Sequence, residues 1–488
     1  MYIMDRMSRK LGRPDALYFD PWPIGHPFLI INDPYLAVQV TSHPVTGSEK
    51  PPGLDAWFLP ITGRGGWNLF TENGSVWKQN NSLFLPFFNN NNLDAILPVV
   101  LRNMVTLRDI LRQKAQIGDM FRLEPLTLAL MNDISGRILF NEDLGNLAGR
   151  PHPISKTMLR QLGIKSAANV VDSLRQLNPF EHLSRWNNGR ILDNHIRAQV
   201  HKQLNTLQNA KTEEEDDGGS GFKTILGQAL KSYYAQTGKR TSEPPDEEFM
   251  KMLVAQLRMF FFAGYDSTSS AMVSSCYLLW KHPEALAKVR AEHDRVLGPD
   301  PTTCADRIAE NPSVLNALTY TTAVIKEAMR LFPPASGVRA GCADLVLRGR
   351  DGTTYPTAGV TPQINHLGLQ RNPAVWPRAL EFLPERFMVG AGDALHPPAG
   401  AWRAFEHGVR SCTGQAFVMK ELRAFLALLA REFDLRDCYD EVYAGEDLDL
   451  THVDGEKAYM IEAGSAHPRG QMPVRVSLSG YTPPGADA

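Results

Sequence analysis

The chain has 488 residues, of which 43% are hydrophobic and 21% charged, and its formal net charge is -2. This composition allows a large buried core, and the near-neutral charge excludes a general basic field that would attract nucleic acid. The five cysteines are odd in number, far apart and without a CxxC pair, which argues against a disulfide framework or a structural zinc site. We therefore expect an intracellular protein, in which one cysteine can still act as a nucleophile or a soft metal ligand.

The first residues show no targeting or membrane-spanning segment. Residues 1–10 are mixed in charge, and the apolar stretch of a signal peptide does not follow them. The longest apolar stretch, residues 252–263, is interrupted by Arg258, and no run reaches the roughly 18 residues that a membrane span needs. We expect the chain to be soluble as given, with peripheral membrane contact at most.

One low-complexity segment, residues 212–222, joins a run of acidic residues to glycines. Because like charges repel and glycine adds conformational entropy, we expect a flexible surface loop there. The signals on both sides of this loop belong together, so we expect one domain over residues 1–488.

Most of the chain is predicted to be helical, and a long central helix matters most. It should begin after Pro244-Pro245, where three acidic residues suit the positive end of the helix dipole, and it should end at Pro283. At about 1.5 Å per residue it spans roughly 50 Å, enough to cross a domain. Glycine and hydroxyl side chains at residues 263–270 predict a local distortion that serves a site.

A second important helix is predicted directly after Cys412. Its apolar stripe repeats at i, i+4, i+7 and i+11, with charged residues off the stripe, and consists of Val418, Leu422, Phe425 and Leu429. Strands are sparser, and the best candidates are residues 360–365 and 472–478. The expected fold class is therefore mainly α with small β-sheets.

The segment around Cys412 carries the strongest chemical signal. A helix N-terminus lowers the pKa of a thiol and favours the thiolate, which is the form that binds a metal. Gly408 and Gly414 allow the backbone to approach a flat cofactor closely. Arg410 can pair with a carboxylate of such a cofactor, and Phe405 can shield the sulfur from water.

The pattern F-x-x-G-x-R-x-C-x-G at residues 405–414 resembles the heme-binding loop of the cytochrome P-450 family. Two further motifs resemble that family in its order. The segment from Glu327 to Arg330 is similar to the E-x-x-R helix, and residues 382–387 are similar to the P-E-R-F segment. The resemblance implies that Arg386 joins Glu327 and Arg330 in a buried network behind the heme.

A third motif lies in the centre of the long helix and reads Ala263-Gly264-Tyr265-Asp266-Ser267-Thr268. It resembles the family's oxygen-activating groove, which implies that Asp266, Ser267 and Thr268 deliver protons. The resemblance covers essentially the whole chain, and residues 185–190 and 464–468 are similar to segments of fungal members.

The resemblance implies the helical triangular prism of this family, with heme b between the long helix and the Cys412 loop. Cys412 would bind the iron. The other residues that it assigns to the cofactor are Arg410, Arg339, Phe405, Gly408, Gly414, Trp77, Ala263 and Gly264.

The chain departs from the family pattern at three positions. Ser267 stands where threonine is usual, Asn81 stands at the arginine of the W-x-x-x-R motif, and Gln370 stands where many relatives have histidine. The last two changes put in doubt how the propionate edge of the heme is charged. His366 and His407 lie at no ligand position of the family, so we expect them to be structural or solvent-facing.

The implied activity is that of a monooxygenase, which takes O2 and electrons from NADPH through a reductase and oxidises a lipophilic small molecule. Substrate contacts would come from four segments: residues 50–67, 260–265, 334–338 and 462–468. A natural-product intermediate is the expected substrate. Microsomal relatives carry an anchor ahead of the position where this sequence opens, so we expect endoplasmic-reticulum association if a native anchor is missing.

Two other functions remain open at this point. The same heme site can act as a desaturase, coupling enzyme or isomerase without net oxygen insertion, and the substitution at Ser267 leaves room for this. A non-enzymatic heme sensor or carrier is disfavoured, because a carrier needs no Asp266-Ser267 proton relay.

Overall fold

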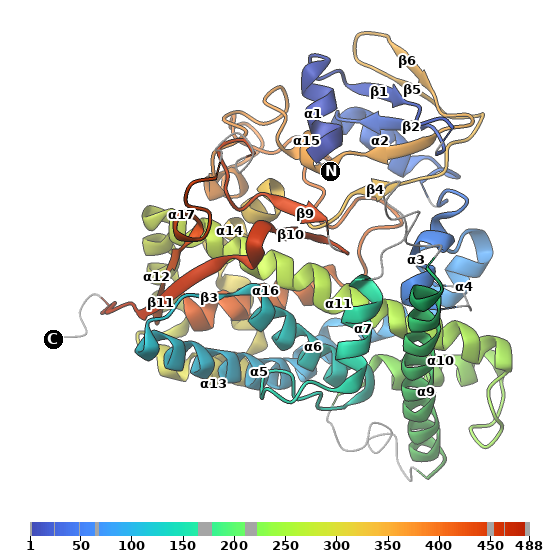
Figure 1. Cartoon of the computed structure of the whole chain (residues 1–488), viewed down its shortest axis with the longest axis horizontal. Helices are drawn as coiled ribbons and strands as arrows, with labels where there is room; N and C mark the ends of the chain where they lie inside the picture. The colour runs from blue at the N-terminus through green and yellow to red at the C-terminus, as the bar shows by residue number, and fades with distance from the viewer. Residues whose placement is uncertain are drawn as a thin grey trace. The chain divides into compact units, whose positions relative to one another are not determined.

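The structure is a computed structural model, and it describes residues 2–23, 25–47, 49–63, 68–163, 178–209, 222–446, 453–462 and 464–483 (Figure 1). The expected flexible loop at 212–222 lies outside the described residues except for Phe222. The chain divides into two compact units. Unit 1 comprises Met1–Pro51, Met104–Thr127 and Ser267–Ala488, and unit 2 comprises Pro52–Asn103 and Leu128–Asp266. The single domain over residues 1–488 stays a prediction.

Unit 1 contains all the β-strands of the described chain, in four small sheets. The largest has the order β1-β2-β7-β4, in which β2 and β7 are parallel and the other pairs antiparallel. Its strands are β1 (Ala16–Phe19), β2 (Phe28–Ile31), β7 (Thr361–Ile364) and β4 (Gly337–Val338). The predicted strand at 360–365 is thereby confirmed. A hydrophobic core lies on this sheet, and its fully buried members include Leu29, Ile31, Leu36, Val40, Leu347, Ile364, Leu369 and Trp376.

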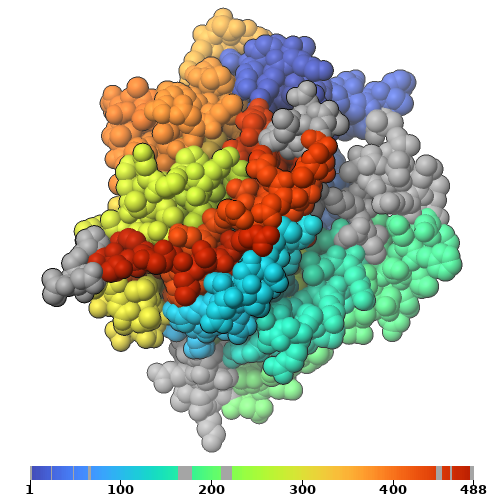
Figure 2. Space-filling model, turned by 60° about the vertical axis from the view of Figure 1, so that its left-hand side comes forward, coloured from blue at the N-terminus to red at the C-terminus, as the bar shows by residue number. Residues whose placement is uncertain are grey.

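A second, antiparallel sheet has the order β3-β11-β8 and places Val476 opposite Leu435. Its strands are β3 (Phe121–Arg122), β11 (Pro473–Leu478) and β8 (Phe433–Asp437). In Figure 2 the C-terminal segment, in red, lies along the segment near residue 120, in cyan, as this pairing requires. The predicted strand at 472–478 is confirmed. Two hairpins complete the strands: β5 (Val346–Arg348) with β6 (Thr354–Pro356), and β9 (Met460–Glu462) with β10 (Ala466–Pro468).

The remaining elements of unit 1 are helical. The α-helices are α1 (Tyr2–Lys10), α2 (Pro34–Ser42), α12 (Pro283–Leu297), α13 (Cys304–Glu310), α14 (Thr319–Leu331), α15 (His366–Gln370), α16 (Gln415–Leu429) and α17 (Tyr439–Val442). Short 3-10 turns are η3 (Pro301–Thr303), η4 (Pro312–Ala317), η5 (Pro384–Phe387) and η6 (Arg469–Gln471). The start of α2 follows from the sequence. The helix begins at Pro34, and the Asp33 carboxylate before it accepts the Leu36 N–H at 3.0 Å.

Among the described residues of unit 2, all the regular secondary-structure elements are helices. It contains α3 (Leu54–Thr62), α4 (Gly74–Phe84), η1 (Leu85–Phe88), α7 (Pro153–Gly163), α9 (Pro179–Asn209) and α10 (Ile225–Thr237). Helix α9 buries one stripe at a spacing of four residues, formed by Asn188, Leu192, Ile196, Val200 and Leu204. Helix α7 packs on α9, and α10 packs on α4, so this stripe and its neighbours form the unit's core.

Three helices continue from one unit into the other, namely α5 (Asn90–Ile117), α6 (Glu124–Phe140) and α11 (Glu247–Lys281). The predicted long central helix is α11, and the predicted helix after Cys412 is α16, so both predictions are confirmed. The predicted distortion at residues 263–270 is wrong, because the backbone is α-helical throughout α11. The hydroxyls there bond elsewhere: Ser269 contacts the Thr127 hydroxyl at 2.7 Å, and Ser270 donates to the Ala466 carbonyl at 2.5 Å.

The mainly α fold class with small sheets is confirmed. Within the described part of the chain, each helix is too short or too polar to cross a lipid bilayer.

Candidate active site

Cys412 lies in a loop that leads directly into α16. Its N–H donates to the Phe405 carbonyl at 2.9 Å, which closes the loop. The Cys412 side chain is exposed to solvent, yet many protein atoms lie close around it. Both observations fit a thiol that is open to solvent on one side only. Burial raises the pKa of the thiol, whereas the backbone N–H groups of Gly414 and Gln415 lower it. The helix N-terminus thus acts in the expected direction, and burial acts against it.

The glycine and the aromatic residue before Cys412 have clear structural roles. Gly408 has a φ of +83°, and a Cβ there would lie 2.5 Å from the carbonyl oxygen of Thr41. This packing against the end of α2 requires a glycine whether or not a cofactor also approaches it. Phe405 is buried, and its ring meets Trp402 edge to face at 5.8 Å. A shielding role for Phe405 stays a prediction.

Four cationic side chains gather beside the Cys412 loop around one carboxylate. Glu406 accepts a hydrogen bond from Arg403 Nη1 at 2.8 Å and lies 3.3 Å from Arg339 Nη1. Both arginines are fully buried. Burial, followed by the charges of Arg339 and Arg410, lowers the pKa of Lys50 well below its ordinary value. We call Lys50, Arg339, Arg403, Arg410 and Glu406 the cationic group.

Glu406 keeps its negative charge firmly within this group. Burial by itself raises its pKa, but the nearby His366, 3.6 Å away, and the charges of Arg339 and Arg403 lower the pKa of Glu406 well below its usual range. His366 is buried, and its Nδ1 contacts the Ala335 carbonyl at 2.9 Å. His407 is exposed. The two histidines are thus placed as expected, one structural and one at the surface.

The cationic group has buried donor atoms that the described protein does not use. The Nη2 atoms of Arg339 and Arg403 have no hydrogen-bond partner among the described residues, and the charges of Arg339 and Arg410 act on the buried Lys50. Buried unpaired donors and buried like charges are both unfavourable, so the group suits an incoming anion. A planar cofactor that carries two carboxylates fits these donors, while the neighbouring Cys412 supplies a soft ligand for its iron. The residues present therefore fit heme.

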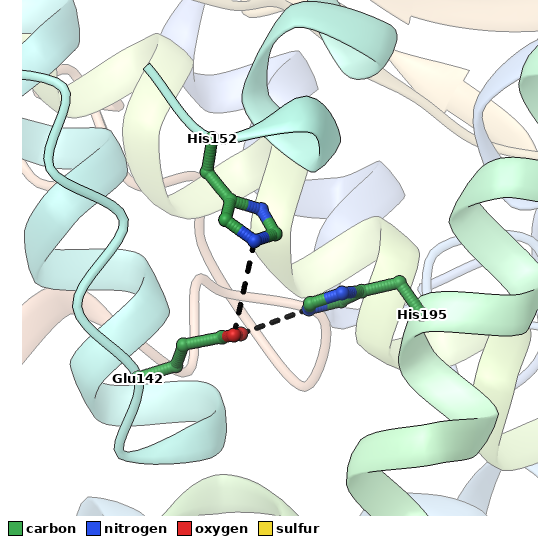
Figure 3. A group of neighbouring side chains, drawn as sticks. All are labelled: Glu142, His152 and His195. Atoms are coloured by element: carbon green, nitrogen blue, oxygen red, sulfur yellow. Dashed lines mark hydrogen bonds and ion pairs between the residues drawn. The ribbon is translucent and has the colours of Figure 1, made fainter. Parts of the chain in front are cut away.

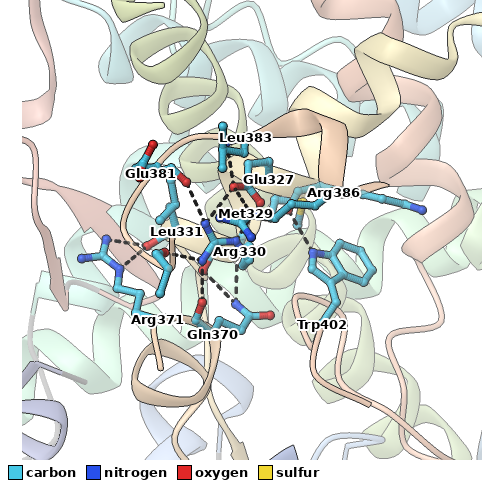
Figure 4. Close-up of polar contacts among 12 residues, drawn as sticks. Glu327, Met329, Arg330, Leu331, Gln370, Arg371, Glu381, Leu383, Arg386 and Trp402 are labelled. Atoms are coloured by element: carbon cyan, nitrogen blue, oxygen red, sulfur yellow. Dashed lines mark hydrogen bonds and ion pairs between the residues drawn. The ribbon is translucent and has the colours of Figure 1, made fainter. Parts of the chain in front are cut away.

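A second buried group joins the E-x-x-R helix to the P-E-R-F segment (Figure 4). Nε and Nη2 of Arg330 donate to the Glu327 carboxylate, each at 2.7 Å, and Arg386 Nε donates to the same carboxylate at 3.2 Å. The Leu383 N–H adds a bond at 2.9 Å, and all three charged side chains are fully buried. Arg330 also donates to three backbone carbonyls, those of Gln370, Ala379 and Glu381. The structure thus brings the three predicted network residues together.

Gln370 connects this network to the cationic group. Its amide Nε2 donates to the carbonyls of Met329 and Arg330 at 3.2 and 3.1 Å, and its Oε1 accepts the Arg403 N–H at 2.6 Å. The side chain is fully buried and its polar atoms are occupied by the backbone. Gln370 therefore holds the backbone at Arg403, two residues before Phe405. Its side-chain amide is already hydrogen-bonded to the protein.

The centre of α11 presents a stripe of small residues. Ala263 is exposed and Gly264 and Ser267 are half-buried, and their spacing places them on one helix face. Asp266 and Thr268 are buried on other faces. The Thr268 hydroxyl has no hydrogen-bond partner within the described chain. The predicted relay residues are thus consecutive on the helix but point in different directions.

Trp77 and Asn81 lie one turn apart on α4 in unit 2, and both are half-buried. The assignment of Trp77 to the cofactor and the effect of Asn81 at the propionate edge stay predictions.

The Cys412 loop, the cationic group beside it and the Glu327 network together suit a heme-thiolate protein. A model of the cytochrome P-450 family matches residues 18–443. The chain is similar to the cytochrome P-450 monooxygenase polC of Polytolypa hystricis, with 33% identity over 98% of this chain and 84% of the relative. It is also similar to the monooxygenase acrF of Aspergillus aculeatus, with 30% identity over 98% of this chain and 96% of the relative. The monooxygenase ptmG of Penicillium ochrochloron is 25% identical over 97% of this chain and 84% of its own length.

The chain belongs to the cytochrome P-450 family. It is accordingly a monooxygenase of that family, whose members use heme and O2.

Sequence reasoning missed three members of the cationic group. Arg403 and Glu406 are spaced at i, i+3 immediately before and within the cysteine motif, which was a usable signal. Lys50 lies more than 280 residues before Arg339, and no local pattern marks it. Only the folded chain brings it to this group.

Proposed function

We propose that this protein hydroxylates or epoxidises a lipophilic small molecule, using electrons that an NADPH-dependent reductase supplies. The observation that supports this best is the cationic group beside Cys412 in a chain of the cytochrome P-450 family. When bound, heme with a thiolate ligand supplies the activation of O2. One oxygen atom then enters the substrate, and the other leaves as water.

Cys412 would hold the heme iron as the thiolate, helped by the N–H groups of Gly414 and Gln415. Arg339 and Arg403 would direct their unpaired Nη2 atoms to the heme propionates, and Lys50 and Arg410 would add positive charge. Phe405 would keep water from the sulfur.

Proton delivery would fall to the centre of α11. Ser267 lies on the accessible face of the helix beside Ala263 and Gly264, where a hydroxyl can hold a water molecule. Asp266, buried next to it, would supply protons from the protein side. Thr268, on another face of the helix, adds a second hydroxyl, which has no hydrogen-bond partner among the described residues and can assist Ser267.

Replacing the hydroxyls tests this relay. Ser267→Ala should raise the peroxide released per NADPH consumed, and Ser267→Ala with Thr268→Val should raise it further. Ser274→Ala is the matched control, because the Ser274 hydroxyl bonds the carbonyl of Ser270 within the helix. An unchanged peroxide yield in both relay variants would remove these hydroxyls from proton delivery.

The substrate is proposed to be an apolar natural-product intermediate. In unit 2, the half-buried Phe260 ring packs edge to face on Phe84 at 5.1 Å, and Trp57 and Phe58 form another aromatic pair. Phe261 and Tyr265 are fully buried and belong to the core. Phe260 is therefore the member of residues 260–265 that best suits substrate contact. The three relatives named above are fungal, which supports a fungal natural product as the substrate class.

A comparison of metabolites with and without this chain tests the reaction. The proposal predicts that a precursor accumulates whose mass is lower than that of the lost product by one oxygen atom. A precursor of equal mass, or one heavier by two hydrogens, would instead support a reaction without net oxygen insertion. Association with the endoplasmic reticulum is part of the proposal, and fractionation of the source cells tests it.

A further inference from the structure

Unit 2 contains a cluster of side chains of the kinds that bind metal ions. This cluster has no part in the proposed function. Glu142 follows α6, His152 precedes α7, and His195 lies in α9 (Figure 3). Figure 3 shows both imidazoles directed at the Glu142 carboxylate. Their possible ligand atoms all lie within 4.8 Å of one another. Separate segments of the chain thus bring two nitrogen donors and one oxygen donor to one point.

We propose that Glu142, His152 and His195 form a binding site for Zn²⁺, with water as the fourth ligand. Two imidazoles and one carboxylate are a common set of three protein ligands for this ion.

The geometry needs only small adjustments to hold the ion. His195 Nε2 lies 2.8 Å from Glu142 Oε2, and His152 Nε2 lies 3.9 Å from Glu142 Oε1. Tetrahedral zinc with bonds of about 2.0–2.1 Å separates its ligand atoms by about 3.3 Å. One of these distances must therefore open and the other must close, each by less than about 1 Å, and no pair of ligand atoms starts more than 4.8 Å apart.

The backbone holds the ligands in place from both sides. The Glu142 N–H donates to the Gly136 carbonyl at 3.1 Å, and the His152 N–H donates to the Leu144 carbonyl at 3.1 Å. His195 is anchored by α9, which packs on α7. A site with pre-positioned ligands loses less entropy when the ion binds.

Exposure also suits a bound cation. The side chains of Glu142, His152 and His195 are 24%, 27% and 17% exposed, so an ion can enter and keep a water ligand. The charge of Lys202 acts on Glu142 and opposes the ion.

His152 is expected to be the weakest of the three ligands. Its Nδ1 accepts the Ile154 N–H at 3.3 Å, which places the ring proton on Nε2. Zinc binding through Nε2 moves this proton to Nδ1 and breaks that long hydrogen bond. Among the described residues, His195 Nδ1 makes no such hydrogen bond. Loss of His195 should therefore weaken zinc binding more than loss of His152.

The test uses the full-length, heme-loaded protein after divalent ions have been removed with a chelator. Zn²⁺ is then titrated in competition with a chromogenic chelator at neutral pH. The variants are His195→Gln and Glu142→Gln, which keep hydrogen-bonding groups but lose good zinc ligands. His201→Gln is the matched control, because His201 is an exposed histidine of the same helix. The proposal predicts that wild type and the control bind one ion alike, and that the two variants bind it at least tenfold more weakly.

Equal zinc affinity in all four proteins would overturn the proposal, as would a wild type that binds only at millimolar zinc. X-ray absorption of the wild type with one equivalent of Zn²⁺ gives a result that does not depend on the folding of any variant. Two imidazole ligands are expected there, and fewer than two would contradict the site. Neither measurement reads monooxygenase activity, so failure of this site and failure of the proposed function are distinguishable.

Discussion

Two buried groups of arginines in unit 1 differ in how fully the protein satisfies their hydrogen-bond donors. Arg330 makes five hydrogen bonds, two to Glu327 and three to backbone carbonyls. Arg339 makes two to backbone carbonyls and an ion pair with Glu406, and its Nη2 has no hydrogen-bond partner in the described chain. The first group is nearly satisfied by the protein itself. The second group has donor atoms, Nη2 of Arg339 and of Arg403, that no described residue uses and that a ligand can take.

This difference separates a structural network from a binding site that contains the same residue types. Burial alone does not distinguish them, because Arg330 and Arg339 are both fully buried. Their hydrogen bonds do, because every guanidinium nitrogen of Arg330 donates, whereas Arg339 Nη2 has no partner among the described residues. Substitutions in the two groups should therefore affect stability and heme binding in different proportions.

The largest effect is expected when the carboxylate of the structural network is removed. Glu327→Ala leaves Arg330 and Arg386 as uncompensated buried charges, which costs about 3–5 kcal/mol of unfolding free energy. Thermal unfolding and the yield of folded protein measure this. Glu381→Ala is the control, since Glu381 pairs with Arg378 at the surface and its loss should change little. A Glu327→Ala protein as stable as wild type would contradict the account of this network.

A smaller and different effect is expected in the cationic group. Arg339→Leu should weaken heme binding ten- to a hundredfold, because one charge-assisted contact to a carboxylate is lost, a contact of about 1.5–3 kcal/mol. The heme-free protein should be destabilised much less than by Glu327→Ala. Heme titration and thermal unfolding measure the two quantities separately. Arg423→Leu on α16 is the control, because Arg423 contacts the backbone and Asn316 elsewhere in unit 1. Severe unfolding of the heme-free Arg339→Leu protein would place Arg339 in the structural network instead.

Gln370 lies between the groups, so its loss should affect both quantities. Gln370→Leu leaves the Arg403 N–H and the carbonyls of Met329 and Arg330 without this partner. We expect a loss of about 1–3 kcal/mol in unfolding free energy, together with reduced heme retention. If heme retention were unchanged while stability fell, the link from the network to the cationic group would be disproved.

The smallest effect appears only in acid. The pKa of Glu406 is lower in the folded protein than in the unfolded chain, so its contribution to stability is complete above the unfolded pKa of about 4.3. That contribution is lost as the pH falls below this value towards the folded pKa. Between pH 5 and 3 the unfolding midpoint of the wild type should therefore fall more steeply than that of Glu406→Gln. Parallel pH profiles would mean that Glu406 is not held as an anion by its neighbours.

The sequence predicted the elements with strong local patterns. Helix α11 was predictable from its acidic start and its terminal proline, and α16 and β11 from the spacing of their apolar residues. The Glu327, Arg330 and Arg386 positions followed from the family motifs, and the structure joins their side chains. These features depend on neighbours in sequence or on fixed motifs.

Features that depend on distant contacts were not predictable. The sequence indicated that the helix N-terminus lowers the Cys412 pKa, but it could not show the burial that raises this pKa. The expected distortion of α11 failed because the hydroxyls of Ser269 and Ser270 bond to groups far away in sequence. From the sequence, Gln370 only removed a partner for a heme propionate. In the structure its side-chain amide holds the backbone of Arg403.

The central claim, that Cys412 is the iron ligand, is tested most directly by the spectrum of the reduced protein with carbon monoxide. Wild type should show the strongly red-shifted Soret band of a thiolate ligand, and Cys412→Ala should lack it. Cys342→Ala is the control and should retain the band, because the Cys342 thiol contacts the Thr46 hydroxyl. Persistence of the band in Cys412→Ala would show that another residue binds the iron and would contradict the account of the site.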